Sequence, residues 1–248
     1  MSSATVIIPA RFGSSRFPAK ILAADTGRPL VQHVVDQVGK CKNVKRVIVA
    51  TDDQRIVDAL QPFGTRCVMT SAEHQSGTDR IAEVARTLED EIIVNVQGDE
   101  PEIEPATIDA LIDRLQSSAD QMSTAATRWP NGADPRDPNL VKVVVSQAGH
   151  AMYFSRAPIP FPRDEALSAS SYLLHQGIYA YRRDFLLKFA SLPQTELEKT
   201  EKLEQLRVLE NGHKIGVMIT ERAVHGIDTP EQYANFVKRS KNGIAHGQ

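Results

Sequence analysis

Short apolar runs alternate with amphipathic segments over the first 115 or so residues of the chain. Runs rich in Val and Ile at residues 6–8, 47–50, 67–69 and 92–96 predict buried strands. Apolar residues at helical spacing predict helices over 29–40, after Asp53, over 78–88 and over 105–115. This alternation predicts an α/β fold with a mainly parallel, Rossmann-like sheet and right-handed crossovers.

The pattern changes after about residue 120. Strand-like runs at 141–145, 151–154 and 177–181 follow one another without regular helices between them, and 157–171 has the composition of a long loop. A helix is predicted over 196–211, with Gly212 ending it, and another begins at Pro230. We therefore expect a mixed-sheet extension of the first part, within a single domain over residues 1–248.

The run at 92–96 ends abruptly in Gln97-Gly98-Asp99-Glu100-Pro101. Gly and Pro stop the strand, so the two carboxylates lie at the carboxyl end of a core strand. Ligands bind at that edge in open α/β sheets, and a carboxylate there suits a hard divalent cation that holds a phosphate. The alternative interpretation is an ordinary acidic turn.

The segment after the first strand, residues 9–20, combines three cations with small residues. Arg11, Arg16 and Lys20 offer positive charge, and Gly13-Ser14-Ser15 offers backbone N–H groups, as a triphosphate requires. The alternative is an exposed basic loop. The chain contains neither G-x-G-x-x-G nor a Walker A sequence, which argues against a dinucleotide site and a P-loop.

Composition narrows the possible functions. The 248 residues carry a formal net charge of -2, which argues against an electrostatic nucleic-acid binder. Cys41 and Cys67 have no metal-like or redox spacing, and no apolar stretch approaches the length of a membrane span. The N-terminus lacks the basic region of a signal peptide. We expect a soluble, cytoplasmic protein that binds neither nucleic acid nor membrane.

Eight motifs occur in order along the chain. The first three are I-P-A-R-x-x-S-x-R-x-P-x-K at 8–20, S-G-T-D-R at 76–80 and V-Q-G-D-E-P at 96–101. Further matching segments lie at 138–144, 153–157, 175–181, 203–207 and 227–230. With these motifs the chain resembles the 3-deoxy-manno-octulosonate cytidylyltransferases, the CMP-Kdo synthetases. Ala19 departs from the usual Gly of that pattern, and Leu174 from a frequent Arg.

The resemblance implies a Mg²⁺-dependent nucleotidyltransferase. Such an enzyme transfers CMP from CTP to the anomeric hydroxyl of 3-deoxy-D-manno-octulosonate (Kdo), giving CMP-Kdo and pyrophosphate for lipopolysaccharide biosynthesis. The resemblance also implies a homodimer. Residues 1–118 would then form the CTP-binding part, and 119–248 the sugar-binding and dimerisation part.

The resemblance further assigns residues to the site. The implied catalytic residues are Arg11, Arg16, Lys20, Asp99 and Asp228, with Asp99 and Asp228 as the Mg²⁺ ligands. The implied nucleotide-binding residues are Arg11, Gly13, Ser14, Lys20, Ser76, Gly77, Thr78, Arg80 and Asp99. The implied sugar-binding residues are Arg16, Gln97, Arg156, Arg163, His175, Tyr179, Glu204 and Gln205.

Without the resemblance, several of these residues have simpler interpretations. Asp228 before a proline is a good helix N-cap, His175 beside an apolar strand is an ordinary edge histidine, and Glu204 is a solvated helix residue. Two other functions also remain open. One is a different sugar or polyol nucleotidyltransferase of the same fold, and the other is a nucleotide-binding regulatory module without turnover.

Overall fold

The computed structural model describes residues 4–13, 17–163, 171–223 and 226–245. The chain divides into two compact units. One, here called the N-terminal unit, comprises residues 3–89, 95–105 and 224–248, and the other, the central unit, comprises 1–2, 90–94 and 106–223. A single domain over 1–248, with a CTP-binding part over 1–118 and a sugar-binding part over 119–248, stays a prediction.

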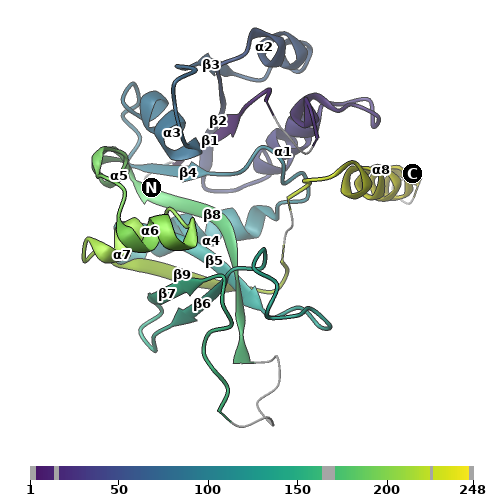
Figure 1. Ribbon diagram of the computed structural model, residues 1–248. Helices are drawn as coiled ribbons and strands as arrows, with labels where there is room; N and C mark the ends of the chain where they lie inside the picture. The colour runs from purple at the N-terminus through teal and green to yellow at the C-terminus, as the bar shows by residue number, and fades with distance from the viewer. Residues whose placement is uncertain (1–3, 14–16, 164–170, 224–225, 246–248) are drawn as a thin grey trace. The chain divides into compact units, whose positions relative to one another are not determined.

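The N-terminal unit is built on a parallel sheet in the order β3-β2-β1. Its strands are β1 (Ala4–Ala10), β2 (Val44–Thr51) and β3 (Cys67–Met69). Its helices are η1 (Lys20–Leu22), α1 (Leu30–Val38), α2 (Gln54–Leu60), η2 (Gln61–Phe63), α3 (Gly77–Ala85) and α8 (Pro230–Ala245). Figure 1 shows α1 on one side of β1 and β2 and α3 on the other. The βαβ rhythm predicted for this part is confirmed.

The C-terminal helix α8 belongs to the N-terminal unit because of its aromatic side chains. Tyr233 and Phe236 are buried in a cluster with Leu30 of α1 and Ile227. The Phe236 ring also lies edge-on to His33, with 5.1 Å between ring centroids. This packing fixes the segment just before α8, which carries Asp228.

The central unit has strands of mixed direction. It contains β4 (Ile92–Asn95, its last residue in the N-terminal unit), β5 (Met122–Arg128), β6 (Lys142–Val145), β7 (Ala151–Ser155), β8 (Leu173–Arg182) and β9 (Ile215–Thr220). β5 pairs antiparallel with β8 and parallel with β9, while β6 and β7 form an antiparallel hairpin. The mixed-sheet extension is therefore confirmed.

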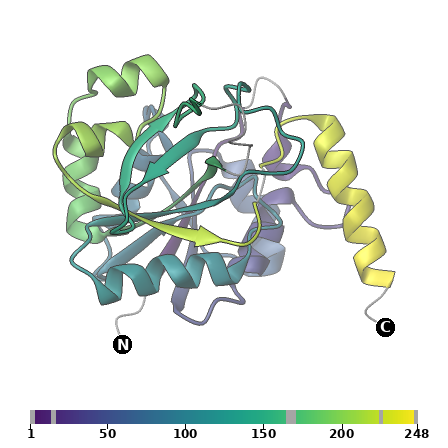
Figure 2. The same ribbon diagram turned by 90° about the horizontal axis from the view of Figure 1, so that it is seen from below.

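The helices of this unit are α4 (Pro105–Ser117), α5 (Arg183–Ser191), α6 (Glu196–Glu201) and α7 (Leu206–Glu210). Figure 2 shows α4 running along β9. Gly216 of β9 allows this approach, because a Cβ there would lie 2.9 Å from Nε of Arg114 on α4. None of the described helices is long and apolar enough to cross a membrane.

Two expectations about elements are wrong. The helix over 196–211 is two helices, α6 and α7, because Lys202 takes a left-handed conformation with φ 53°. β1 also extends two residues past its predicted end and includes Pro9, which pairs in register with Ala50.

Candidate active site

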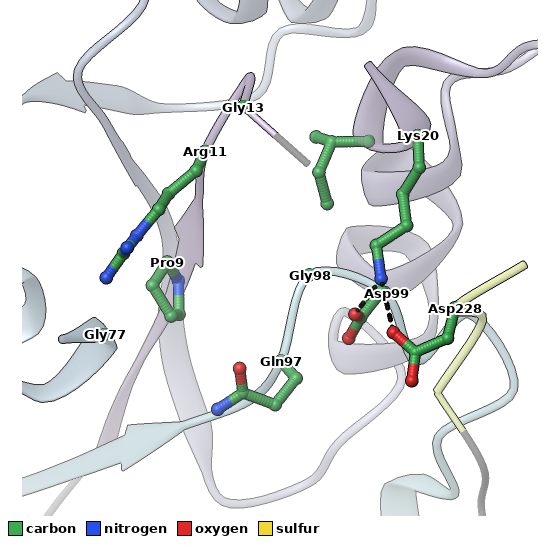
Figure 3. A pocket seen from close by; sticks show the side chains of 10 residues that line it. Pro9, Arg11, Gly13, Lys20, Gly77, Gln97, Gly98, Asp99 and Asp228 are labelled. Carbon is green, nitrogen blue, oxygen red and sulfur yellow. Dashed lines mark hydrogen bonds and ion pairs between the residues drawn. The ribbon is translucent and has the colours of Figure 1, made fainter. Parts of the chain in front are cut away.

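A pocket of about 420 Å³ lies in the N-terminal unit, at the carboxyl end of β1 (Figure 3). Side chains and backbone from four separate segments of the chain form its wall. The lining residues are Pro9, Arg11, Gly13, Lys20, Ile21, Gly77, Gln97, Gly98, Asp99 and Asp228. Of the residues assigned to chemistry from the sequence, this pocket brings together Arg11, Gly13, Lys20, Gly77, Gln97, Asp99 and Asp228.

A close backbone approach shapes the turn that carries Asp99. A Cβ on Gly98 would lie 3.1 Å from the carbonyl oxygen of Pro9 and 3.3 Å from Cδ1 of Ile21. Those contacts are tighter than most Cβ contacts, so glycine lets the turn lie against the end of β1 without a shift of its neighbours. Gln97 and Asp99, on either side of it, line the pocket.

Two carboxylates in the pocket converge on one cation. The ammonium Nζ of Lys20 lies 2.5 Å from Oδ2 of Asp99 and 3.0 Å from Oδ1 of Asp228 (Figure 3). It also donates a hydrogen bond of 2.7 Å to the carbonyl oxygen of Ile227. The backbone supports this arrangement, since the N–H of Ile227 donates to the carbonyl oxygen of Asp99 at 2.9 Å.

This donor set fits a magnesium ion. Two carboxylates already share a cation here, and Mg²⁺ is usually held by one or two carboxylates with substrate phosphates and water. The described residues contain no group of three or more His, Cys, Asp and Glu side chains that could enclose a metal. The remaining ligands of an ion between Asp99 and Asp228 must therefore come from outside this side-chain set.

The N-terminus of α3 also reaches the pocket. Ser76 caps the helix, because its hydroxyl accepts from the backbone N–H of Asp79 at 3.1 Å while the Asp79 carboxylate accepts from the N–H of Ser76. Gly77, the first helical residue, lines the pocket, and a Cβ added there would lie 3.4 Å from Cγ of Pro9. The positive end of the helix dipole therefore lies where an anion would bind.

The basic loop after β1 is held at one point by an aromatic contact. The Arg55 guanidinium carbon lies 3.4 Å from the ring centroid of Phe12. Arg11, which precedes Phe12 in the chain, is exposed, and its guanidinium donates a hydrogen bond to the carbonyl oxygen of Gln75 at 3.1 Å. Ser14 and Arg16, also assigned to the site, lie outside the described residues.

Arg80 and Thr78 do not line the pocket. The Arg80 side chain is fully buried, and its terminal nitrogens donate to Oγ1 of Thr70 at 2.5 Å and to Oδ2 of Asp52 at 2.7 Å. Thr78 is buried as well. The structure thus shows Arg80 joining α3 to the segments after β2 and β3, and its direct contact with a nucleotide stays a prediction.

Glu100 differs sharply from its neighbour Asp99. Burial, with the charge of Asp99 adding to it, raises the pKa of Glu100 to about 8. Glu100 is therefore protonated at neutral pH and does not act as a metal ligand in this state. Of the two carboxyl groups after the strand, only Asp99 lines the pocket.

The residues assigned to the sugar lie mostly in the central unit. His175 and Tyr179 are neighbours on β8, with 5.6 Å between ring centroids, and His175 also meets Phe154 edge-on at 4.8 Å. Burial lowers the pKa of His175 to about 3, so the ring is neutral. Gln97 lines the pocket of the N-terminal unit instead.

Glu204 and Gln205 lie in the turn between α6 and α7, not within a helix. Gln205 is buried, and its amide nitrogen has no hydrogen-bond partner in the described part of the chain. A buried amide donor of this kind indicates a missing ligand or water. The Glu204 carboxylate lies 3.6 Å from Nη2 of Arg207.

The two arginines assigned to the sugar carboxylate differ in their contacts. The Arg156 guanidinium donates to three backbone carbonyls, those of Pro138, Glu201 and Lys202, at 2.7, 2.7 and 3.3 Å. Arg163 is exposed. Arg156 therefore holds backbone segments together, and contact of either arginine with a sugar carboxylate stays a prediction.

Comparison with known proteins shows the family to which this chain belongs. A match to the cytidylyltransferase family covers residues 5–215. The 3-deoxy-manno-octulosonate cytidylyltransferase of Geobacter sulfurreducens is 50% identical over 247 residues, 96% of this chain and 99% of the relative. The chain belongs to the 3-deoxy-manno-octulosonate cytidylyltransferase family.

Solved structures place the fold in the same family. CMP:2-keto-3-deoxy-manno-octonic acid synthetase complexed with CTP superposes with a TM-score of 0.92 at 40% identity, covering 98% of this chain and 100% of that chain. The fold extends further, to 4-diphosphocytidyl-2C-methyl-D-erythritol synthase from Anaerococcus prevotii, at 14% identity and a TM-score of 0.63 over 98% of this chain and 99% of that one.

One departure from the cytidylyltransferase pattern has a structural consequence. Ala19 stands where the family usually has Gly, and its backbone is left-handed, with φ 53° and ψ 24°. A side chain in that conformation costs about 1–2 kcal/mol, which explains why glycine is usual there. The chain tolerates this strain immediately before Lys20.

Sequence reasoning missed two contributors to this cytidylyltransferase site. One is the backbone carbonyl of Ile227, which accepts from Lys20, and the other is Ile21, which packs beside Gly98. Their proximity to the motifs was visible in the sequence. Their roles were not, because a backbone acceptor has no residue signature and Ile21 reads as ordinary core.

Proposed function

We infer that this chain transfers the cytidylyl group of CTP to the anomeric hydroxyl of Kdo, giving CMP-Kdo and pyrophosphate. The observation that carries this inference is a pocket in which Arg11, Lys20, the N-terminus of α3 and two converging carboxylates meet. Cations and oriented N–H groups offset the charge of a triphosphate. The CTP complex of a 40% identical relative and the name shared by relatives near 50% identity support CTP and Kdo as the substrates.

The reaction is an in-line displacement at phosphorus. The Kdo hydroxyl oxygen forms a bond to the α-phosphorus, the bond from that phosphorus to the bridging oxygen breaks, and pyrophosphate leaves with the bonding electrons. The hydroxyl proton passes to solvent. Arg11 and Lys20 neutralise charge that accumulates on the leaving group, and the pocket aligns the reacting atoms.

Magnesium is part of this proposal, with Asp99 and Asp228 as its protein ligands. When bound, the ion supplies a Lewis acid that screens the phosphates and lowers the pKa of the attacking hydroxyl. The two carboxylates already converge on the Lys20 ammonium, which supports the assignment. Asp99→Asn and Asp228→Asn should each nearly abolish Mg²⁺-dependent turnover while far-UV circular dichroism stays unchanged. Near-normal rates in either variant would refute the assignment.

For the sugar, we propose that Arg163 binds the Kdo carboxylate and that His175 and Gln205 bind hydroxyls. A guanidinium matches a carboxylate in bidentate geometry, and Arg163 is exposed to solvent. The buried amide nitrogen of Gln205 offers a donor. Tyr179, Glu204 and Gln97 complete the proposed set, together with Arg16, which is not among the described residues.

Kinetics with each substrate varied in turn test the sugar assignment. Arg163→Ala and His175→Ala should raise the KM for Kdo by about 10-fold or more, the loss expected for one charged or buried hydrogen bond, and should leave the KM for CTP nearly unchanged. Equal increases for both substrates would indicate general damage to the fold and would remove the assignment.

We further propose that the enzyme is a homodimer that acts in the cytoplasm, in lipopolysaccharide synthesis. The central unit exposes Met152 on β7, with 63% of its surface accessible, beside the half-buried Tyr153. Exposed apolar and aromatic patches mark interfaces, so we propose the strands near Tyr153 as the subunit contact. Light scattering should give the mass of a dimer, and Met152→Glu should shift it towards the monomer. A monomeric wild-type protein at micromolar concentration would exclude this proposal.

A panel of acceptors tests the proposed function as a whole. With CTP and Mg²⁺ fixed, pyrophosphate release should be fast with Kdo and weak with sialic acid or neutral sugars. A faster rate with another acidic sugar would assign the chain to a different nucleotidyltransferase specificity. Binding of CTP without release of pyrophosphate for any acceptor would indicate a regulatory module.

A further inference from the structure

β8 contains a bulge beside the residues assigned to the sugar. In the antiparallel pairing with β5, Ala125 lies opposite Gln176, but the preceding residue Thr124 lies opposite Tyr179. Residues 177–178 of β8 therefore have no counterpart on β5. Such an insertion bends a strand and leaves backbone groups out of the regular ladder.

The bulge brings two sugar-site residues together. In an unbroken strand His175 and Tyr179 would be roughly 13 Å apart along the chain, at about 3.3 Å per residue. Residues 177–178 have no counterpart on β5. His175 and Tyr179 therefore face positions 126 and 124, which are only two residues apart on β5. Their ring centroids are 5.6 Å apart.

The hydroxyl of Thr124 contacts the backbone of β8 at the bulge. Its oxygen lies 2.8 Å from the carbonyl oxygen of Ile178 and 3.2 Å from that of Gln176. The same oxygen lies 2.9 Å from Nε2 of His175. Thr124 is fully buried, so water does not compete for these contacts.

Hydrogen-bond chemistry fixes the direction of each contact. Both carbonyl oxygens only accept, so the single hydroxyl hydrogen of Thr124 is donated to them. The oxygen then accepts from the ring, which requires a hydrogen on Nε2 of His175. A neutral imidazole carries one N–H, and burial, which lowers the pKa of His175 to about 3, keeps it neutral. The other nitrogen, Nδ1, is then an acceptor, and the described residues provide it with no donor.

We propose that Thr124 is a positioning residue that holds His175 in the Nε2–H tautomer, so that Nδ1 accepts a hydrogen bond from a hydroxyl of Kdo. The sugar half of this inference rests on the proposed function, whereas the tautomer half rests on the geometry alone. Thr124 acts on the substrate only through the histidine ring.

Long-range ¹H–¹⁵N NMR of the ring nitrogens tests the tautomer directly in the substrate-free protein. The wild type should show a protonated Nε2 and an unprotonated Nδ1. Thr124→Val should weaken that preference, and Thr124→Ser, which keeps the hydroxyl, should restore it. Thr127→Val is the matched control, because Thr127 is buried on the same strand and its hydroxyl has no hydrogen-bond partner in the described residues. A wild-type ring protonated on Nδ1 would overturn the proposal.

Steady-state kinetics test the link to the sugar. Thr124→Val should raise the KM for Kdo about 5- to 20-fold, the effect of losing one hydrogen bond, with the KM for CTP changed by less than about twofold. Thr124→Ser and Thr127→Val should match the wild type. An unchanged KM for Kdo in a folded Thr124→Val protein would overturn the positioning role. If Thr124→Val fails to fold, two other variants test the positioning role beside the tautomer of the wild type. Thr124→Ser should then keep the wild-type KM for Kdo, and Thr124→Ala should raise it. If the enzyme makes no CMP-Kdo, the proposed function fails, and the NMR result still decides the tautomer.

Discussion

Replacing Lys20 by Met removes the cation between the two carboxylates while keeping most of the side-chain volume. The ammonium donates to three oxygens, at 2.5, 2.7 and 3.0 Å. Hydrogen bonds to charged groups contribute about 1.5–3 kcal/mol each. The carboxylates of Asp99 and Asp228 are 27% and 39% exposed, so water replaces part of the loss. We therefore expect Lys20→Met to lower the free energy of unfolding by about 2–4 kcal/mol in metal-free buffer.

Thermal unfolding with and without Mg²⁺ measures this effect and its cause. For a chain of this size the loss corresponds to a Tm decrease of roughly 4–16 °C. Mg²⁺ should restore part of it in Lys20→Met, because an ion at about ten times its Kd adds about 1.4 kcal/mol. Lys40→Met is the control, since Lys40 is exposed and contacts only Gln37 among the described side chains. Equal Tm values for the two variants, or a Tm decrease in Lys20→Met that Mg²⁺ leaves unchanged, would contradict this role of Lys20.

Three further predictions follow from single residues. Because Glu100 has a raised pKa of about 8 against an ordinary 4.5, the folded protein keeps a proton that the unfolded chain releases, and stability falls as pH rises from 4.5 to 8. Glu100→Gln should flatten that slope by up to about 1.4 kcal/mol per pH unit in chemical denaturation, and an unaltered slope would contradict it. Ala19→Gly should raise stability by up to about 1 kcal/mol by removing left-handed strain, and a lower Tm would contradict this. His175, with a pKa of about 3, should show ring NMR resonances that stay constant from about pH 5 to 8, and an inflection in that range would contradict so low a pKa.

The first half of the fold was predictable because each element there has its own local signal. Val- and Ile-rich strands, the Ser76 capping box and Pro105 at a helix start all act through neighbouring residues. β6, β7 and β8 were predicted from their apolar runs as well, whereas β5 lacks such a signal. β5 is Met-Ser-Thr-Ala-Ala-Thr-Arg, a strand held by its neighbours on both sides and not by its own composition.

The site divides in the same way. Arg11 and Asp99 were predictable because segments that end parallel strands meet at one edge of the sheet, whereas Gly77 and Asp228 were assigned only through the family resemblance. The break at Lys202 and the bulge in β8 were not, since both are set by packing across the unit rather than by sequence spacing. Glu204 therefore lies in a turn and not on the predicted helix, and no spacing in the sequence points to Thr124.

Formation of CMP-Kdo by this chain can be observed in a single experiment. Phosphorus-31 NMR of purified protein with CTP, Kdo and Mg²⁺ tests it most directly, because product and leaving group are both visible. We expect a new phosphodiester signal for CMP-Kdo that grows in equal amount with pyrophosphate, and little signal when UTP replaces CTP. A folded protein that leaves CTP and Kdo unchanged under these conditions, or that uses UTP equally well, would contradict it.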